Sequence, residues 1–203
     1  PAAGPEAEPG GALLFDRTDH GLLLVTGERA EPALQQTCTS DVAALEAGQA
    51  QPAFLLDKEG LLIDDVAVGR LAPDGLGRDR FLLITNPENH ERVKAWLRAL
   101  GDGYTLFDAQ DLFAKVEGPI TVEDLRQAPV AECMVALALD GPAAAEVLGR
   151  AGGLPGHCLQ GGADHYAVIV PAAQVQAAYD RLIAAGAAPG SAEALLARRA
   201  ASG

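Results

Sequence analysis

Residues 79–101, DRFLLITNPENHERVKAWLRALG, are the segment most informative about the fold, because in them an apolar strand pattern passes directly into an amphipathic helix pattern. The run RFLLIT has the length and the side chains of a buried strand. After PEN, apolar residues recur at helical spacing with charged residues between them: Val93, Trp96, Leu97 and Leu100. The same order returns in residues 164–186, DHYAVIVPAAQVQAAYDRLIAAG, which indicates an internal repeat.

A second pair of matching segments supports the repeat. Residues 22–34, LLLVTGERAEPAL, and residues 136–148, ALALDGPAAAEVL, each read as a strand, a glycine turn and a helix. Two related β-α units, each closed by a further strand and an amphipathic helix, are typical of an α+β fold. We therefore expect duplicated β-α units that form antiparallel sheets with helices.

The remaining segments give the expected organisation of the chain. Residues 1–11, PAAGPEAEPGG, have no periodicity and predict a disordered tail. Residues 12–203 then form one folded domain made of two interlocked subdomains, approximately 12–110 and 111–203.

Within the first copy, a strand is expected at 21–26 and a helix at 28–37. A short helix is expected over DVAALEAG, residues 41–48, with Ser40 or Thr39 as its N-terminal cap.

The first copy also contains a β-hairpin that the second copy lacks. The run PAFLL, the tight loop DKEG and the run LLIDDVAVGRL together form this pattern, with Gly60 at the position that tolerates positive φ. Two adjacent carboxylates, Asp64 and Asp65, lie inside the apolar run. Because side chains alternate along a strand, one Asp is buried if the strand includes both of them. The alternative is a strand that begins at Val66, with both carboxylates in solvent.

Composition excludes several classes of function. The 203 residues carry 15 Lys and Arg against 28 Asp and Glu, a net charge of −13, which disfavours nucleic acid and anionic membrane surfaces as partners. No apolar stretch approaches the roughly 20 residues of a membrane span, so we expect no membrane insertion and a cytoplasmic or organelle-matrix location. Three cysteines and four histidines are scattered without metal-ligand or triad spacing, so free thiols and no metal site are expected.

The order of these motifs resembles that of a known superfamily. The segments FLLDKEGLLIDDVAVGRL, DRFLLITNPENHERVKAWL, LALDGPAAAEVL and HYAVIVPAAQVQAAYDRLIAAGAAP are similar to the glycine-cleavage T-protein (aminomethyltransferase, GcvT) superfamily. That superfamily also includes the YgfZ-like folate-binding proteins and folate-dependent demethylases. The resemblance covers about residues 20–203 and is strongest in GLLIDD and RFLLITNPEN.

The resemblance implies a tetrahydrofolate site and names residues for it. The family's catalytic aspartate matches Asp65, which would lie beside the folate nitrogens where the one-carbon unit is transferred. The family's asparagine matches Asn86, a hydrogen-bond partner for the pterin. The small residues Ala67 and Gly69 would leave room for a ring over the same face.

Several family positions depart from the pattern. A family tyrosine falls on Pro52, and the family glutamate that holds the amino-pyrimidine edge falls on Ala167. The family's C-terminal barrel domain has no counterpart in these residues, so another protein subunit is the expected partner. The YgfZ-like cysteine signature is also unmatched, because PGHCLQGG around Cys158 shares only a cysteine and a glycine with it.

Three functions remain open from the sequence. The first is a GcvT-like subunit of a larger complex, a folate-binding-type module with a partly degenerate pterin site. The second is a tetrahydrofolate-dependent one-carbon transferase, an aminomethyltransferase or demethylase, whose site a partner chain completes. The third is a YgfZ-like factor for iron–sulfur cluster maintenance.

Overall fold

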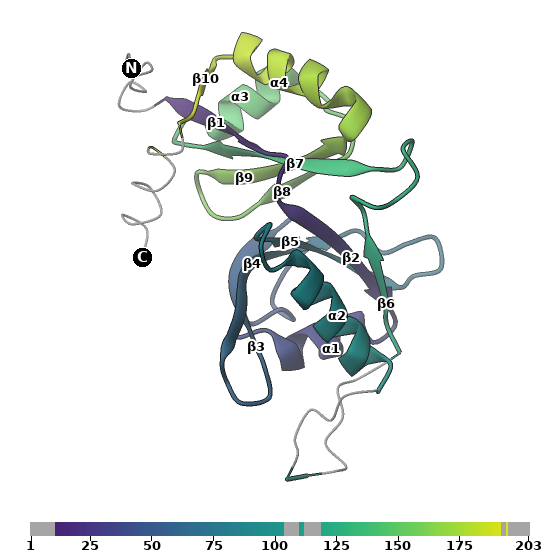
Figure 1. Cartoon of the computed structure of the whole chain (residues 1–203). Coiled ribbons are helices and arrows are strands. Elements are labelled where there is room, and N and C mark those ends of the chain that lie inside the picture. The colour runs from purple at the N-terminus through teal and green to yellow at the C-terminus, as the bar shows by residue number, and fades with distance from the viewer. Residues whose placement is uncertain (1–10, 104–109, 112–118, 192–193, 195–203) are drawn as a thin grey trace. The chain divides into compact units, whose positions relative to one another are not determined.

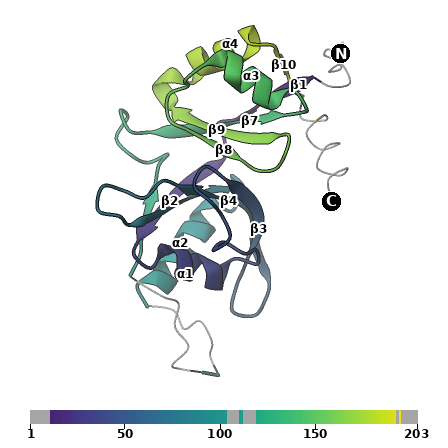
Figure 2. The same cartoon turned by 180° about the vertical axis from the view of Figure 1, so that it is seen from behind.

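The computed structural model describes residues 11–103, 110–111, 119–191 and 194, and it divides the chain into two compact units (Figures 1 and 2). One unit spans residues 20–133, and the other combines the N-terminal residues up to Asp19 with residues 134–203. Most of the tail expected over residues 1–11 lies outside the described residues. Among the described residues, no helix is long and apolar enough to cross a membrane.

The unit of residues 20–133 contains a five-stranded sheet in the order β3-β4-β5-β2-β6. All of its neighbouring strands are antiparallel. Its elements are β2 (Gly21–Gly27), α1 (Ala30–Thr37), β3 (Ala50–Leu56), β4 (Leu62–Leu71), β5 (Asp79–Thr85), α2 (His90–Gly101) and β6 (Thr121–Asp124). The expected strand, helix and hairpin are present, and Gly60 in the hairpin turn has a φ of 78°.

The other unit contains a sheet in the order β10-β1-β7-β9-β8. Only the pairing of β1 with β10 is parallel. Its elements are β1 (Ala12–Arg17), β7 (Met134–Asp140), α3 (Ala144–Ala151), β8 (His157–Gln160), β9 (His165–Pro171), the 3-10 turn η1 (Ala172–Gln174), α4 (Val175–Ala184) and β10 (Ala187–Pro189).

The two sheets confirm the duplicated α+β architecture. Strands β6-β2-β5-β4 of one unit have the same order and antiparallel pairing as β1-β7-β9-β8 of the other. In each unit a strand-helix pair, β2-α1 or β7-α3, precedes the strand-helix pair β5-α2 or β9-α4. Between these pairs one unit has the hairpin β3-β4, and the other has the single strand β8.

The division of the chain differs from the expected boundary near residue 110. Strand β6, which lies after that boundary, pairs with β2 and so belongs to the unit of residues 20–133. Strand β1, which lies before it, pairs with β7 and β10 and belongs to the other unit. The physical reason is strand pairing between segments distant in sequence, which local patterns do not reveal.

The prediction of a helix over residues 41–48, capped by Ser40 or Thr39, is wrong. The segment is an irregular loop that places Val42 and Leu45 in the core. Its backbone bonds to neighbouring elements, since Gly48 N–H donates to the Arg70 carbonyl and Ala43 N–H donates to Gln35 Oε1. An eight-residue helix is marginal in isolation, so these tertiary partners decide the conformation.

The core of residues 20–133 lies between the sheet and its two helices. Along β2, β4 and β5, successive side chains point to opposite faces of the sheet, and those on one face pack against α1 and α2. The helices contribute Ala30, Leu34, Val93 and Leu97 to this core. The opposite face of the same sheet carries the alternate residues, which include the fully buried Leu22 and Leu82 and the exposed Asp65.

Candidate functional site

The two carboxylates of the hairpin have different environments. Strand β4 begins at Leu62, so it contains both Asp64 and Asp65, and a strand beginning at Val66 is wrong. Only 1% of Asp64 is exposed, whereas Asp65 is exposed. The pairing of β4 with β3 shifts between Leu55 and Leu56, so Ile63 is an extra residue in β4. This bulge buries Ile63 and Asp64 in succession and leaves Asp65 on the open face.

Among the described residues, the side-chain hydrogen bonds to buried Asp64 come from asparagines in the segment between β5 and α2. The backbone N–H of Asn86 donates to Asp64 Oδ2 at 3.0 Å, and its side-chain amide donates to Oδ1 at 2.8 Å. Asn89 Nδ2 donates to the same Oδ1 at 2.9 Å. Three donors compensate the loss of hydration that a buried carboxylate suffers. Asp64 therefore fixes this segment against β4.

Asn89 occupies the N-cap position of α2 but does not cap it with its side chain. Its carbonyl accepts the Val93 N–H at 2.9 Å, while its amide is directed to Asp64. An asparagine at this position ordinarily bonds to the first turn of its helix. Here the start of α2 is anchored to β4 instead.

Asn86 joins the two carboxylates. Besides its bonds to Asp64, its side-chain amide donates to the Asp65 carbonyl at 3.1 Å and to Asp65 Oδ1. The structure thus brings together Asp65 and Asn86, the two residues that the family resemblance selects. Within the described part of the chain, no lysine, arginine or histidine forms an ion pair with Asp65.

The face around Asp65 combines small residues with an exposed aromatic ring. Phe54 on β3 lies directly opposite Asp65 in the strand register and is 53% exposed. Ala67 and Gly69 follow Asp65 at two-residue intervals on the same face. Pro52 is also exposed and lies opposite Ala67 on the edge strand β3, where the missing N–H of a proline is tolerated.

A buried polar network stabilises the neighbouring segment. Thr85 Oγ1 and His90 Nδ1 are 3.0 Å apart, and His90 Nε2 lies 2.9 Å from Asp124 Oδ2. Lys94 Nζ donates to the same Asp124 oxygen at 2.8 Å and to Glu91 Oε1 at 2.7 Å. The network ties the residues on either side of Asn86 and Asn89 to β6.

The charges of this network shift its pKa values. Burial raises the pKa of Asp124, but hydrogen bonds from Lys94 and His90 outweigh it and hold that pKa below its usual range. Burial lowers the pKa of Lys94, but its bonds to Asp124 and Glu91 outweigh that effect and raise the pKa. Both groups are therefore charged near neutral pH.

The same network contains the set His90, Glu91 and Asp124, whose ligand atoms lie within 4.8 Å of one another. The ammonium group of Lys94 already contacts both carboxylates of this set. A fixed positive charge there repels a metal ion and satisfies the same oxygens. We therefore interpret these residues as part of an ion-pair cluster in which Lys94 contacts both Glu91 and Asp124.

The remaining sequence-selected positions lie on the unit containing β7 to β10. Ala167, onto which the family resemblance places a glutamate, is buried in β9. Cys158 is exposed on β8, although partial burial of its thiol raises its pKa and so lowers the thiolate fraction. Cys38, Cys133 and Cys158 are free, as expected.

Sequence reasoning missed the residues that support Asp65. It leaves open which aspartate is buried and gives no role to Asn89, His90, Lys94 or Asp124. The repeated polar residues in TNPENHE were a local signal, since Asn86 and Asn89 are spaced to reach one acceptor. The pairing with Asp124 had no local signal, because 34 residues separate it from His90.

Comparison with known proteins identifies the family. Residues 9–153 match the model of the GCVT N-terminal domain. The chain is 31% identical over 186 residues to an aminomethyltransferase of Herpetosiphon aurantiacus, covering 88% of this chain and 49% of that protein. An aminomethyltransferase of Chlorobium phaeobacteroides is 35% identical over 117 residues, covering 55% of this chain and 31% of that protein.

A solved structure has a similar fold. The glycine cleavage system aminomethyltransferase T from Bartonella henselae superposes with a TM-score of 0.59 and 24% sequence identity, over 86% of this chain and 46% of that one. The chain thus spans half or less of the length of these relatives. The match over residues 9–153 nevertheless covers most of the sequence, and the chain belongs to the GCVT N-terminal domain family.

Proposed function

We propose that residues 20–133 form a folate-binding-type surface on which Asp65 and Asn86 contact the pterin of tetrahydrofolate. The observation that carries the proposal is the division between the two carboxylates of β4. Asp64 is buried and anchors Asn86, while Asp65 is exposed and accepts a hydrogen bond from the same amide. One aspartate thus positions the site, and the other faces the ligand.

The surroundings of Asp65 suit a flat heteroaromatic ring. Half-buried Ala67 provides a low surface next to Asp65, and the exposed ring of Phe54 stands beside it, whereas Gly69 is buried. Aromatic side chains favour offset or edge contacts with other rings. Tetrahydrofolate, when bound, supplies the nitrogens that carry a one-carbon unit. Asp65 would accept a hydrogen bond or proton at those nitrogens, where positive charge develops.

We further propose that the chain acts within a larger assembly. Pro52 and Ala167 provide neither the hydroxyl nor the carboxylate expected at these positions in active relatives. The hairpin also exposes large apolar side chains next to Asp65, with 53% of Phe54, 64% of Leu61 and 54% of Leu62 accessible. A second polypeptide covering this hairpin would bury apolar surface and could supply the missing polar contacts.

A second candidate function is one-carbon transfer itself. The specific observation in its favour is that Asp65 is not neutralised by a cation among the described residues. A carboxylate in that state can serve as an acceptor in the transfer of an aminomethyl or methyl group. This candidate requires both folate and a one-carbon donor, whereas the binding module requires folate alone.

The test is a calorimetric titration of the full chain with tetrahydrofolate, alone and together with any polypeptide that co-purifies with it. We expect saturable binding that Asp65→Asn weakens by about tenfold or more, since a hydrogen bond to a charged group is lost. Glu59→Gln, an exposed carboxylate on the same hairpin, is the matched control and should leave binding unchanged.

Equal affinity of the wild type and Asp65→Asn would refute the assigned contact. An absence of saturable binding in both settings would refute the folate proposal as a whole. Transfer of labelled carbon to tetrahydrofolate, lost in Asp65→Asn, would separate the transferase from the binding module.

A further inference from the structure

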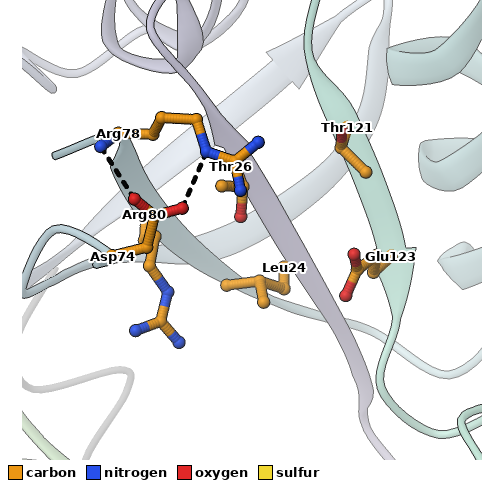
Figure 3. Close-up of a pocket in the computed structure, with 7 residues that line it drawn as sticks. All are labelled: Leu24, Thr26, Asp74, Arg78, Arg80, Thr121 and Glu123. Atoms are coloured by element: carbon orange, nitrogen blue, oxygen red, sulfur yellow. Dashed lines mark hydrogen bonds and ion pairs between the residues drawn. The ribbon is translucent and has the colours of Figure 1, made fainter. Parts of the chain in front are cut away.

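A cavity of about 250 Å³ lies on the unit of residues 20–133, away from Asp65 (Figure 3). Its walls come from β2, β5, β6 and the loop of residues 72–78. Pockets for drug-sized ligands have volumes of roughly 300–1,000 Å³. A ligand of this smaller cavity is therefore a small molecule.

The strand register fixes how the lining residues are arranged. Thr26 on β2 lies between Arg80 on β5 and Thr121 on β6. Two residues earlier on β2, Leu24 lies beside Glu123. Figure 3 shows Leu24 between the guanidinium group of Arg80 and the carboxylate of Glu123. The cavity thus has a positive side, an apolar floor and a negative side.

The other two charged residues of the cavity neutralise each other. Arg78 Nε donates to Asp74 Oδ2 at 2.7 Å, and the backbone N–H groups of Leu76 and Arg78 donate to Asp74 Oδ1. Asp74 therefore has its acceptors occupied. In contrast, neither the guanidinium group of Arg80 nor the carboxylate of Glu123 has a hydrogen bond or ion pair with any described residue. Two unpaired charges of opposite sign face one small cavity.

We propose that this cavity binds a free α-amino acid with a small apolar side chain. The ligand's carboxylate pairs with Arg80, its ammonium group pairs with Glu123, and its side chain lies against Leu24. The hydroxyl groups of Thr26 and Thr121 supply further hydrogen bonds. A planar guanidinium group suits a carboxylate, and a carboxylate suits an ammonium group.

The charges of the cavity select against simpler ligands. An anion without an amine would pair with Arg80 but leave Glu123 unpaired and repelled. A cation without a carboxylate would pair with Glu123 but would be repelled by Arg80. Only a zwitterion satisfies both sides at once.

The cavity is separate from the proposed folate surface. Arg80 is near the start of β5, and Asn86 follows its end, so roughly 20 Å of strand separates them at about 3.4 Å per residue. The amino-acid proposal therefore does not depend on folate binding. Its failure would leave the role of Asp65 untouched.

The test is a titration of the full chain with glycine and with alanine, followed by the backbone amide NMR signals of Thr26 and Thr121. Acetate and methylamine are the probes that carry only one of the two charges. We expect saturable shifts with the amino acids at concentrations up to about 10 mM. We expect binding of acetate and methylamine to be weaker by about tenfold or more.

Two variants assign the contacts. Arg80→Gln and Glu123→Gln should each weaken binding of alanine by about tenfold or more, since each removes one charge-assisted pair. Arg150→Gln on the other unit is the matched control and should bind as the wild type does. Thermal unfolding followed by circular dichroism checks that both cavity variants are folded.

Three results would overturn the proposal. The first is an absence of saturable shifts at Thr26 and Thr121. The second is acetate binding as tight as that of alanine, which would show a simple anion site. The third is unchanged alanine affinity in folded Arg80→Gln or Glu123→Gln.

Discussion

Asn86 donates to Asp64 twice, once from its backbone N–H at 3.0 Å and once from its side-chain amide at 2.8 Å. These two hydrogen bonds hold the segment between β5 and α2 against β4. The same side-chain amide also donates a hydrogen bond to the carboxylate of Asp65. The exposed carboxylate that a ligand would meet is therefore held in place through a buried one.

The first prediction separates stability from binding at the two aspartates. Asp64→Asn should lower the free energy of unfolding by about 2–4 kcal/mol. The new buried NH₂ group would face the N–H donors of Asn86 and Asn89, whose hydrogen bonds a carboxylate oxygen accepts in the wild type. Asp65→Asn should change it by less than about 0.5 kcal/mol, because the side chain is exposed. Urea unfolding of both variants measures the difference. A larger loss in Asp65→Asn would contradict this division of roles.

The second prediction concerns close packing at Gly21. A methyl group at this position would overlap the ring of His90 and the hydroxyl of Thr85, which are hydrogen-bonded to each other. Gly21→Ala should therefore cost about 1–3 kcal/mol of unfolding free energy, as overpacking does. Gly75→Ala is the control, since nothing lies within 4 Å of its added methyl group. Equal stability of the two variants would argue against the tight contact.

The third prediction is the pH dependence that the Lys94–Asp124 pair gives to stability. The pKa of Asp124 is lowered in the folded protein, so its contribution is present above the unfolded pKa near 3.9 and is lost as the pH falls through the folded value. The pKa of Lys94 is raised, so its contribution is present below the unfolded pKa near 10.4 and is lost as the pH rises through the folded value.

Lys94→Met tests this linkage by removing the ammonium group. Urea unfolding as a function of pH should show a smaller acid loss of stability in the variant, because the folded pKa of Asp124 rises toward its unfolded value once its main positive partner is gone. The alkaline loss should become smaller. Glu91→Gln is the control. Because the Glu91 carboxylate is exposed, its removal should change the acid loss and the alkaline loss of stability less. Identical pH profiles of Lys94→Met and the wild type would rule out the pair as a source of pH dependence.

The fourth prediction concerns thiol reactivity. Burial raises the pKa of Cys38 to about 12, although Thr37 lowers it slightly by a hydrogen bond. Near pH 8 its thiolate fraction is about one in ten thousand, and the sulfur is enclosed. An aromatic disulfide reagent should modify Cys158 and Cys133 in the native protein and Cys38 only on unfolding. Modification of all three thiols at one rate without denaturant would show that the surroundings of Cys38 open readily.

Much of the fold was predictable from local pattern. The strand-helix segment of residues 79–101, its repeat at 164–186 and the hairpin with Gly60 follow from apolar periodicity and turn chemistry. These signals act within a few residues, so they survive without tertiary information. The loop at residues 41–48 was not predictable in this way, because its helical composition is overridden by Val42 and Leu45 entering the core.

The candidate site divides along the same line. From the sequence alone, strand alternation limits burial to one of Asp64 and Asp65 if the strand contains both, and the family resemblance selects Asp65 and Asn86. Which aspartate is buried follows from the folded chain, in which Asp64 shares the core face with Val66 and its carboxylate meets asparagine donors more than 20 residues away. The folded chain also brings β1 to β7 and Lys94 to Asp124. Alternation along a strand limits where a side chain can point, but burial and charge compensation depend on neighbours that only the folded chain brings together.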